Sequence, residues 1–466
     1  MSLGADSGHT IEVKSSGYGL AVCALGLEKV CQNEIERIGL EPVGREPGRV
    51  RFGLGEPENA AASLMRANIC LRTAERVLVE VGRFRAADFD QLFDSVRTLP
   101  WELYFHRDEK LVIERVRIKS SKLAAQTSVQ SIVHKAIYER LLSIYKIIRM
   151  PETGKERGLR IYLDTDECVL GLDTSGEALH KRGYRLAVAQ APLKETIAAG
   201  ILFLSGWSRR LPLLDPFCGS GTIAVEAALF AMDRAPGLGR AFALEDMPFA
   251  RSQGRDAALA GPLAAEIEAA KARVRKDADF RIVATDADPR ALEAARANAA
   301  RAGVSAGLEF RLGKAEDSIP GYETGSMICN PPYGERMGTV EDSEAIYRSL
   351  GELSGRFAGW GMGFVTNRPD FGDFFGRFAP ASHKIINGAE EQWYHWYPAG
   401  SEDRPGKRPA ARAERPRGRT EGSRRPEEPR RPAGLGRPWV GPDKPGWTSR
   451  PSTADKPGGK IRKPPR

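Results

Sequence analysis

The six cysteines of this 466-residue chain are scattered, and no two of them form a CxxC pair. The six histidines gather neither with cysteines nor with carboxylates, so the sequence offers no metal site. No apolar run reaches the ~18 residues that a membrane span needs. The first residues also lack the basic start and apolar stretch of a secretory signal. These absences exclude a disulfide framework and a membrane partner, and they favour a cytoplasmic protein with reduced thiols.

The net charge of +9 is unevenly distributed along the chain. Residues 401–466 hold 19 Lys+Arg and 8 Asp+Glu, so this tail carries +11 and residues 1–400 carry −2. The tail is rich in Arg, Pro and Gly and poor in aliphatic residues, which predicts disorder. Such a tail can bind RNA loosely through phosphate charge. A solubilising tail without a specific partner is an equally good interpretation.

The chain is long enough for several domains, and its texture changes along the sequence. Residues 191–400 alternate strands with helices, which predicts an α/β domain with a doubly wound, mostly parallel sheet. Shorter strands and helices come earlier, with two strands around a turn at residues 165–167. The expected divisions are a flexible N-terminus (1–16), a small α+β unit (17–61), a second unit (62–175), a linker (176–190), the α/β domain (191–400) and the tail (401–466).

An apolar strand runs into an acid and a glycine-rich turn in LLDPFCGSGTIAVEAAL, residues 213–229. Asp215 ends the strand, Gly219 and Gly221 form the turn, and a helix follows. Ligands of open α/β sheets bind outside the carboxyl ends of the strands. Glycines let the backbone approach a ligand closely, and the first N–H groups of a helix can hold an anionic group. The segment is therefore predicted to bind a ligand.

The same turn, GSGTIA, also fits the dinucleotide pattern G-x-G-x-x-A, so a hydride-transfer enzyme is an alternative. That pattern expects a ribose-binding acid ~20 residues further on. Here the next strand to end in an acid is RIVATD, whose Asp286 comes about 65 positions after Gly221. A carboxylate at that strand end can accept both hydroxyls of a nucleoside ribose. Asp288, directly before Pro289, is expected to cap the next helix.

Two consecutive prolines in ICNPPYG, residues 328–334, remove two backbone donors and fix two φ angles. The loop follows the strand SMIC and is expected at the same sheet edge as the glycine turn. Asn330 supplies a side-chain oxygen acceptor, the Pro331 carbonyl accepts as well, and Tyr333 has a flat apolar face. Two acceptors that converge beside a ring make a pocket for an exocyclic amino group.

DPFCGSGT (215–222) followed by NPPYG resembles the S-adenosylmethionine-dependent amino-methyltransferases of nucleic acids. The stretches LHKRGYR (179–185), APLKETIAA (191–199), DRAPG (233–237) and NPPYGERM extend the resemblance to the bacterial 23S rRNA guanine-N2 methyltransferase family, over roughly residues 17–400. The resemblance implies a class I (Rossmann-like) methyltransferase domain behind a ferredoxin-like unit and a THUMP RNA-binding domain. It attributes the late Asp286 to a long insertion after DRAPG. A second methyltransferase, which some members carry behind the first, is expected to be absent here.

The implied reaction is methyl transfer from S-adenosylmethionine to the N2 of a guanine in 23S rRNA or in a large-subunit assembly intermediate. The implied catalytic residues are Asn330, Pro331, Pro332 and Tyr333. The implied cofactor residues are Asp215, Phe217, Gly219, Gly221, Thr222, Asp286 and Asp317. One position departs from the family: Lys314 in GKAEDS stands where an aspartate usually contacts the cofactor adenine. Glu316, Asp317 and the backbone near Ala315 are the candidates to replace it.

The basic linker HKRGYR is predicted to contact RNA phosphates and to stack a base. The predicted contact residues are Lys181, Arg182, Tyr184 and Arg185. A solvated linker without RNA contacts is the alternative. The motifs do not separate rRNA from tRNA, nor guanine N2 from adenine N6. An RNA-binding assembly factor that has lost catalysis is a further alternative from another class.

Overall fold

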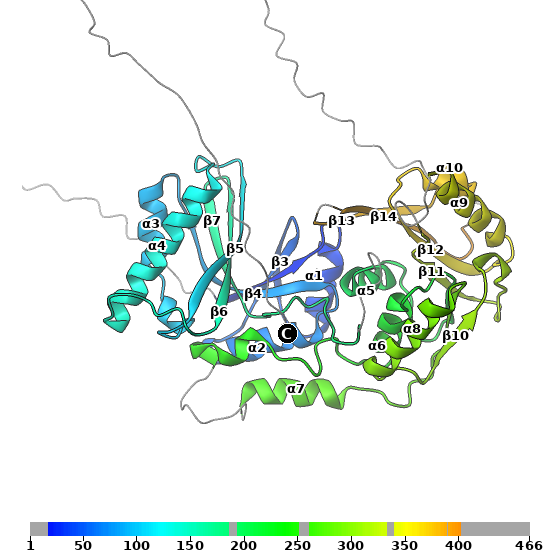
Figure 1. Ribbon diagram of the computed structural model, residues 1–466, viewed down its shortest axis with the longest axis horizontal. Coiled ribbons are helices and arrows are strands. Elements are labelled where there is room, and N and C mark those ends of the chain that lie inside the picture. The colour runs from blue at the N-terminus through cyan, green and yellow to red at the C-terminus, as the bar shows by residue number, and fades with distance from the viewer. Residues whose placement is uncertain (1–16, 186–192, 251–260, 333–339, 389, 402–466) are drawn as a thin grey trace, which may run out of the picture. The chain divides into compact units, whose positions relative to one another are not determined.

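The computed structural model describes residues 17–185, 193–250, 261–332, 340–388 and 390–401 (Figure 1). The predicted flexible N-terminus and nearly all of the predicted disordered tail lie outside these residues. Two separate β-sheets organise the described chain.

The first sheet has seven strands in the order β2-β3-β1-β4-β7-β6-β5. Neighbouring strands run antiparallel except β5 and β6, which run parallel. The strands are β1 Tyr18–Cys23, β2 Pro42–Glu46, β3 Arg49–Gly53, β4 Ala74–Arg85, β5 Lys110–Lys119, β6 Glu156–Asp164 and β7 Glu167–Asp173. Alternate residues of β4 enter different apolar clusters, with Val77 and Val79 in the main core and Leu78 in a small cluster with Leu20. The alternation follows from the period of two in a strand.

Two helices complete the first unit of this sheet: α1 Glu28–Arg37 and α2 Ala60–Cys70. Strand β1 lies between β3 and β4 and pairs with both. Strand β4, and α2 directly before it, therefore belong with β1. The predicted division between residues 61 and 62 cuts through α2, because the sequence pattern does not reveal which strand β4 pairs with.

The second unit adds α3 Phe89–Thr98 and α4 Gln126–Tyr145 to strands β5, β6 and β7. Helix α3 begins behind Asp88, whose carboxylate accepts a 2.8 Å hydrogen bond from the Gln91 N–H. Strands β6 and β7 are joined by a tight turn at Thr165 and Asp166, both with positive φ. The predicted pair of strands around this turn is confirmed.

The second sheet runs in the order β10-β9-β8-β11-β12-β14-β13. Strands β10, β9, β8, β11 and β12 are parallel, whereas β14 is antiparallel to both β12 and β13. The predicted doubly wound, mostly parallel sheet is confirmed. The strands are β8 Leu213–Asp215, β9 Ile282–Asp286, β10 Leu308–Leu312, β11 Gly325–Cys329, β12 Trp360–Thr366, β13 Ala381–Asn387 and β14 Glu390–Tyr397.

Helices cover both faces of this sheet. Alternate strand residues separate into two cores: Leu213 and Ile328 lie in one, Leu214 and Met327 in the other. The first core includes α5 Glu195–Leu204, α6 Thr222–Ala231 and α8 Pro289–Ala302. The second includes α9 Val340–Ser354 and α10 Phe371–Phe375. Helix α7 Pro262–Ala272 instead packs on α2 (Figure 1).

Short 3-10 turns join several of these elements: η1 Pro57–Asn59, η2 Trp101–Leu103, η3 Ala243–Asp246, η4 Pro248–Ala250 and η5 Ala315–Asp317. Strands β8, β9 and β11 are parallel neighbours, so their carboxyl ends meet at one edge of the sheet. This edge brings together Asp215, Asp286 and Asn330, which lie 115 positions apart in the sequence at most.

Candidate active site

In the glycine turn between β8 and α6, Gly219 and Gly221 are required for different reasons. Gly219 has φ +52° and a side chain there would meet nothing within 4 Å, so its backbone is open to a ligand. Gly221 has φ +80°, and a β-carbon there would lie 3.0 Å from the Ala295 Cβ on α8. Gly219 therefore leaves room for a bound group, whereas Gly221 lets α6 pack closely on α8.

Asp286, at the end of β9, holds the glycine turn in place through hydrogen bonds. One carboxylate oxygen accepts a 2.8 Å hydrogen bond from the Gly219 N–H, and the other accepts a 2.9 Å bond from the Asp288 N–H. Each oxygen keeps a second lone pair for a ligand hydroxyl. Asp288 accepts from the Arg290 N–H at 2.9 Å and caps α8, as expected.

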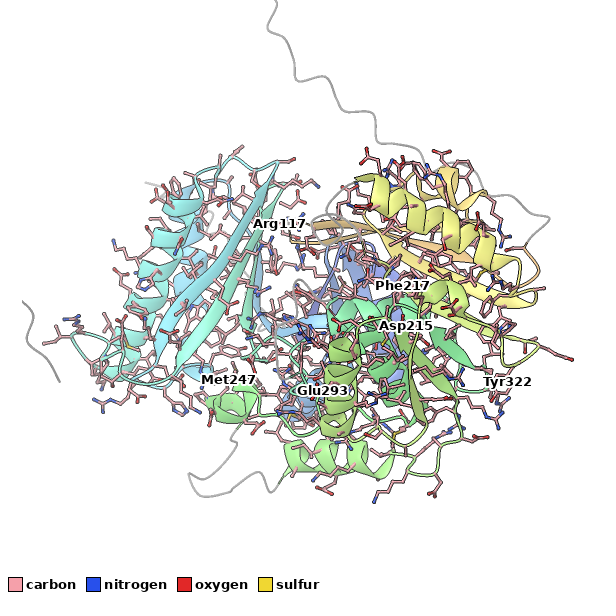
Figure 2. The ribbon with its side chains drawn as sticks, turned by 45° about the vertical axis from the view of Figure 1, so that its right-hand side comes forward. Arg117, Asp215, Phe217, Met247, Glu293 and Tyr322 are labelled. Atoms are coloured by element: carbon pink, nitrogen blue, oxygen red, sulfur yellow. The ribbon has the colours of Figure 1, made fainter. Side chains whose placement is uncertain are left out.

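Asp215 is the buried acid of the site, with 1% of its surface exposed. Burial raises the pKa of its carboxyl group to about 8; a hydrogen bond from the Phe217 N–H opposes this shift, and the charge of Asp286 adds to it. The anionic form is therefore stable near neutral pH only when a positive group lies beside it. Figure 2 shows Asp215 and Phe217 next to each other at this edge.

Asn330 follows the fully buried strand β11. Its side-chain oxygen Oδ1 is buried and has no hydrogen-bond partner among the described residues. Leaving a buried acceptor unpaired costs about 1–3 kcal/mol, so this atom calls for a donor from a ligand. Pro331 is buried and Pro332 is half-buried beside it, whereas Tyr333 lies outside the described residues.

A pocket of about 600 Å³ joins these groups. Five of the predicted residues line it: Phe217, Gly219, Asp286, Asn330 and Pro332. The other lining residues are Pro216, Ala287, Asp288, Lys314, Ala315, Glu316, Ile346, Ser349, Leu350 and Leu353. The predicted residues Asp215, Gly221, Thr222, Pro331 and Asp317 do not line it.

The predicted adenine end of the pocket is formed by Lys314, Ala315 and Glu316 of η5 and the turn before it. Lys314 Nζ lies 3.6 Å from a carboxylate oxygen of Glu316. Asp317, the residue chosen from sequence, is exposed and is not part of the lining. Of the candidates weighed for this position, Glu316 is therefore the carboxylate that the structure brings to the pocket.

Helix α9 contributes an apolar wall that the sequence analysis missed. Ile346, Leu350 and Leu353 line the pocket, and the two leucines are buried. Their spacing of four and three residues is the helical signal that could have revealed this wall. The neighbouring thiols of Cys218 and Cys329 have pKa values raised by burial, so both stay protonated and neither is a nucleophile.

The predicted RNA-contacting linker lies along α6 instead. The Arg185 guanidinium donates a 2.8 Å hydrogen bond to the Thr222 hydroxyl at the start of α6. Tyr184 donates through its hydroxyl to Glu226 at 3.2 Å, and Arg182 lies 3.5 Å from the same carboxylate.

This placement is at odds with the RNA role predicted for three of the four residues. The Tyr184 ring is only 4% exposed, so it offers no face to a base, and the Arg182 side chain is 3% exposed. Arg185 is half-buried and also pairs with Glu195 at 3.2 Å. Lys181 is exposed and pairs with Glu177 at 3.0 Å. The physical reason is that buried acids of α6 and α5 require partners: Glu226 pairs with Arg182, and Glu195 pairs with Arg185.

The described residues contain no cluster of three or more His, Cys, Asp or Glu side chains that could hold a metal ion. Among the same residues, no helix is long and apolar enough to cross a membrane.

Three family models match consecutive parts of the chain. A model described as the RlmL ferredoxin-like domain matches residues 20–78, and one for the THUMP domain matches residues 86–173. A model described as "RMKL-like, methyltransferase domain" matches residues 182–392. The first match ends at residue 78, within β4, and so includes the part of β4 that pairs with β1.

Individual proteins are similar over most of the chain. The "Putative RNA methyltransferase YpsC" of Bacillus subtilis is 36% identical over 380 residues, which cover 81% of this chain and 95% of that protein. The "Ribosomal RNA large subunit methyltransferase K/L" of Syntrophotalea carbinolica is 35% identical over 393 residues, 80% of this chain and 52% of that protein. This chain therefore spans about half the length of such K/L relatives. The crystal structure of SMU.472, a putative methyltransferase complexed with SAH, has a TM-score of 0.71 and 32% identity, and covers 83% of this chain and 99% of that one.

Proposed function

The chain belongs to the RMKL-like RNA methyltransferases that carry ferredoxin-like and THUMP domains before the catalytic domain, and on that premise we propose that it methylates the exocyclic N2 of a guanine in 23S rRNA. The cofactor is S-adenosylmethionine, whose demethylated product SAH is bound in a solved relative. The observation that carries the acceptor assignment is the buried Oδ1 of Asn330 in the pocket wall, which has no hydrogen-bond partner among the described residues.

The pocket residues fit this cofactor. The open backbone at Gly219 accommodates a bulky ligand, and Asp286 has lone pairs left for the ribose hydroxyls. Asp215 is a buried acid that becomes anionic beside a positive group such as the cofactor ammonium. Glu316 lines the adenine end. When bound, the cofactor supplies an electrophilic methyl group on a positively charged sulfur.

Asn330 and Pro331 prepare the acceptor amine. A base amino group has its lone pair delocalised into the ring, which makes the nitrogen a weak nucleophile. Hydrogen bonds donated by this group to the Asn330 Oδ1 and the Pro331 carbonyl favour a pyramidal nitrogen whose lone pair faces the methyl. The same two acceptors stabilise the positive charge that develops on nitrogen. Positioning of the two reactants contributes much of the remaining acceleration, and no strong base is needed.

The target base has to leave its stack to reach this pocket. Flipping costs roughly a few kcal/mol, which stacking on an aromatic ring can offset. Tyr333 follows Pro332 directly and is proposed as that ring. Helix α9 lines the pocket with the apolar side chains Ile346, Leu350 and Leu353.

Mass mapping of nucleosides tests the proposal. An unmodified 23S rRNA transcript, or large-subunit precursors from a deletion strain, is incubated with the protein and methyl-labelled cofactor. The expected product is N2-methylguanosine at one position. N6-methyladenosine would instead assign the adenine alternative, and label only in tRNA would assign the tRNA alternative. No heat of S-adenosylmethionine binding by calorimetry, together with no methylation of any RNA, would favour an assembly factor that has lost catalysis.

A further inference from the structure

A second hollow lies at the opposite edge of the methyltransferase sheet and is larger than the pocket of the active site, at about 1040 Å³. It is lined by three loops that lead into the strands: Pro212 precedes β8, Arg281 precedes β9 and Thr324 precedes β11. The hollow therefore lies at the amino ends of the strands, and we name it the amino-edge groove. No part of the proposed chemistry uses it.

Positive charge dominates this groove. Five cationic side chains line it against three carboxylates, those of Asp277, Asp279 and Glu323. The cations are Arg209, Arg210, Arg275, Lys276 and Arg281. Residues 1–400 carry a slight negative balance, so this local excess runs against the composition of the folded part.

No ion pair or side-chain hydrogen bond joins any of these five cations to another described residue, although Arg281 also contacts the Tyr322 ring. Cations nearby in the same domain behave differently. Lys271 pairs with Glu268 at 2.8 Å and Arg311 pairs with Glu309 at 2.6 Å, although both lysine and arginine are exposed. Neighbouring carboxylates neutralise these two exposed cations, whereas the five groove cations have no ion pair among the described residues and are available to an external anion.

An aromatic ring accompanies these charges. The Tyr322 side chain lines the groove and is 43% exposed, and the Arg281 guanidinium lies 5.2 Å from its ring centroid. Figure 2 shows Tyr322 on the outer side of the domain, away from Asp215 and Phe217. A guanidinium beside an exposed ring can stack on a base as well as contact a phosphate.

We propose that the amino-edge groove binds the phosphate backbone of the substrate RNA at a distance from the target base. The RNA is identified by the proposed function, on which this inference rests. Strand β11 is five residues long, so the two edges are separated by about 17 Å. An A-form RNA helix that continues for about half a turn beyond the target reaches both edges. Contacts of this kind position RNA without reading its sequence.

Paired charge reversals in the full chain test this site. The groove variant is Arg275→Glu/Lys276→Glu, and the control variant is Lys271→Glu/Arg311→Glu, which makes the same change of charge at ion-paired positions. Filter binding of an unmodified 23S rRNA transcript is measured over a range of KCl concentrations. The groove variant is expected to bind at least about tenfold more weakly than wild type. Its salt slope should fall by about 1.4–1.8, since each lost phosphate contact removes about 0.7–0.9.

The control variant is expected to lose less than about threefold in RNA affinity, and both variants should bind S-adenosylmethionine as wild type does. Equal losses in the two variants, or no loss in the groove variant, would overturn the proposal. If the double reversal loses cofactor binding, Arg275→Gln/Lys276→Gln provides the same test without added acids. If the wild-type protein binds the transcript but methylates no RNA, the proposed function is refuted. The groove proposal is unaffected by that result, because it is tested by RNA binding and not by methylation.

Discussion

The two edges of the methyltransferase sheet use opposite means to hold their ligands. At the carboxyl edge, the pocket is lined by Asn330, whose buried Oδ1 has no partner among the described residues, and the buried acid Asp215 lies at the same edge. At the amino edge, a wider groove presents exposed arginines and lysine. Buried polar groups discriminate between ligands, because a ligand that forms no hydrogen bond with them leaves their desolvation cost uncompensated. Exposed cations attract any polyanion and are screened by salt.

On this comparison, we expect the carboxyl edge to serve cofactor binding and catalysis and the amino edge to serve RNA binding. Changes at the carboxyl edge should alter the reaction and cofactor affinity while leaving the salt dependence of RNA binding unchanged. Changes at the amino edge should do the reverse. A variant that moved both sets of measurements would show that the edges are not independent.

The largest effect is expected from Asn330→Ala. Removing one preorganised hydrogen-bonding group for developing charge costs about 10²–10³ in kcat in other enzymes. We therefore expect kcat for methyl transfer to fall by at least about a hundredfold in single-turnover assays, with cofactor affinity nearly unchanged by calorimetry. A large loss of cofactor affinity would mean that Asn330 holds the cofactor rather than the acceptor amine.

Asp215→Asn is expected to weaken cofactor binding by about 10–150-fold, the range for hydrogen bonds to charged groups. It should also change how stability depends on pH. Burial raises the pKa of Asp215 to about 8 in the folded chain, above about 3.9 in the unfolded chain. Its contribution to stability is therefore full below pH ~4 and is lost as the pH rises through about 8.

Thermal unfolding of the cofactor-free protein between pH ~5 and ~9 measures this contribution. The fall in Tm over this range should be smaller in Asp215→Asn than in wild type, because the amide does not ionise. Asp317→Asn is the matched control, since Asp317 is an exposed acid near the same edge. Identical pH profiles for wild type and Asp215→Asn would show that this carboxyl group titrates normally.

Asp286→Asn should have a smaller effect, about a tenfold loss of cofactor affinity. The substitution replaces one acceptor oxygen by a donor, so one of the bonds from the Gly219 and Asp288 N–H groups is lost. Asp288→Asn serves as control, because asparagine caps helices as well as aspartate does. Calorimetry with S-adenosylmethionine compares the two, and normal affinity in Asp286→Asn would exclude its ribose role.

The meeting of Asp215, Asp286 and Asn330 at one sheet edge could be predicted from sequence, because the signals for it are local. A strand, an acid and a glycine turn follow one another between Leu213 and Gly221, and the parallel sheet then places Asp286 and Asn330 beside them. The wall formed by α9 also had a readable period, in Ile346, Leu350 and Leu353. The sequence pattern could not show which polar side chains are buried, because their burial depends on residues far away in the chain.

The linker illustrates that limit. Lys181, Arg182, Tyr184 and Arg185 form a basic and aromatic cluster that suits an RNA surface equally well on composition alone. Arg182 and Tyr184 instead contact Glu226, a buried acid on α6 more than 40 positions further on, which no local pattern connects with them. Glu316 and Asp317 pose the same difficulty, because one turn of η5 decides which of the two carboxylates lines the pocket.

The smallest effect is expected from Tyr184→Phe. This substitution tests whether the linker is independent of RNA binding and catalysis at the two sheet edges. The change removes the hydroxyl bond to Glu226 and keeps the ring, so stability should fall by about 0.5–1.5 kcal/mol. RNA affinity, its salt slope and kcat should all stay within about twofold of wild type, because the ring is buried. Denaturant unfolding measures the stability, and filter binding measures the RNA affinity and its salt slope. If Tyr184→Phe weakened RNA binding without loss of stability, the linker would have to open and stack on RNA as the sequence first indicated.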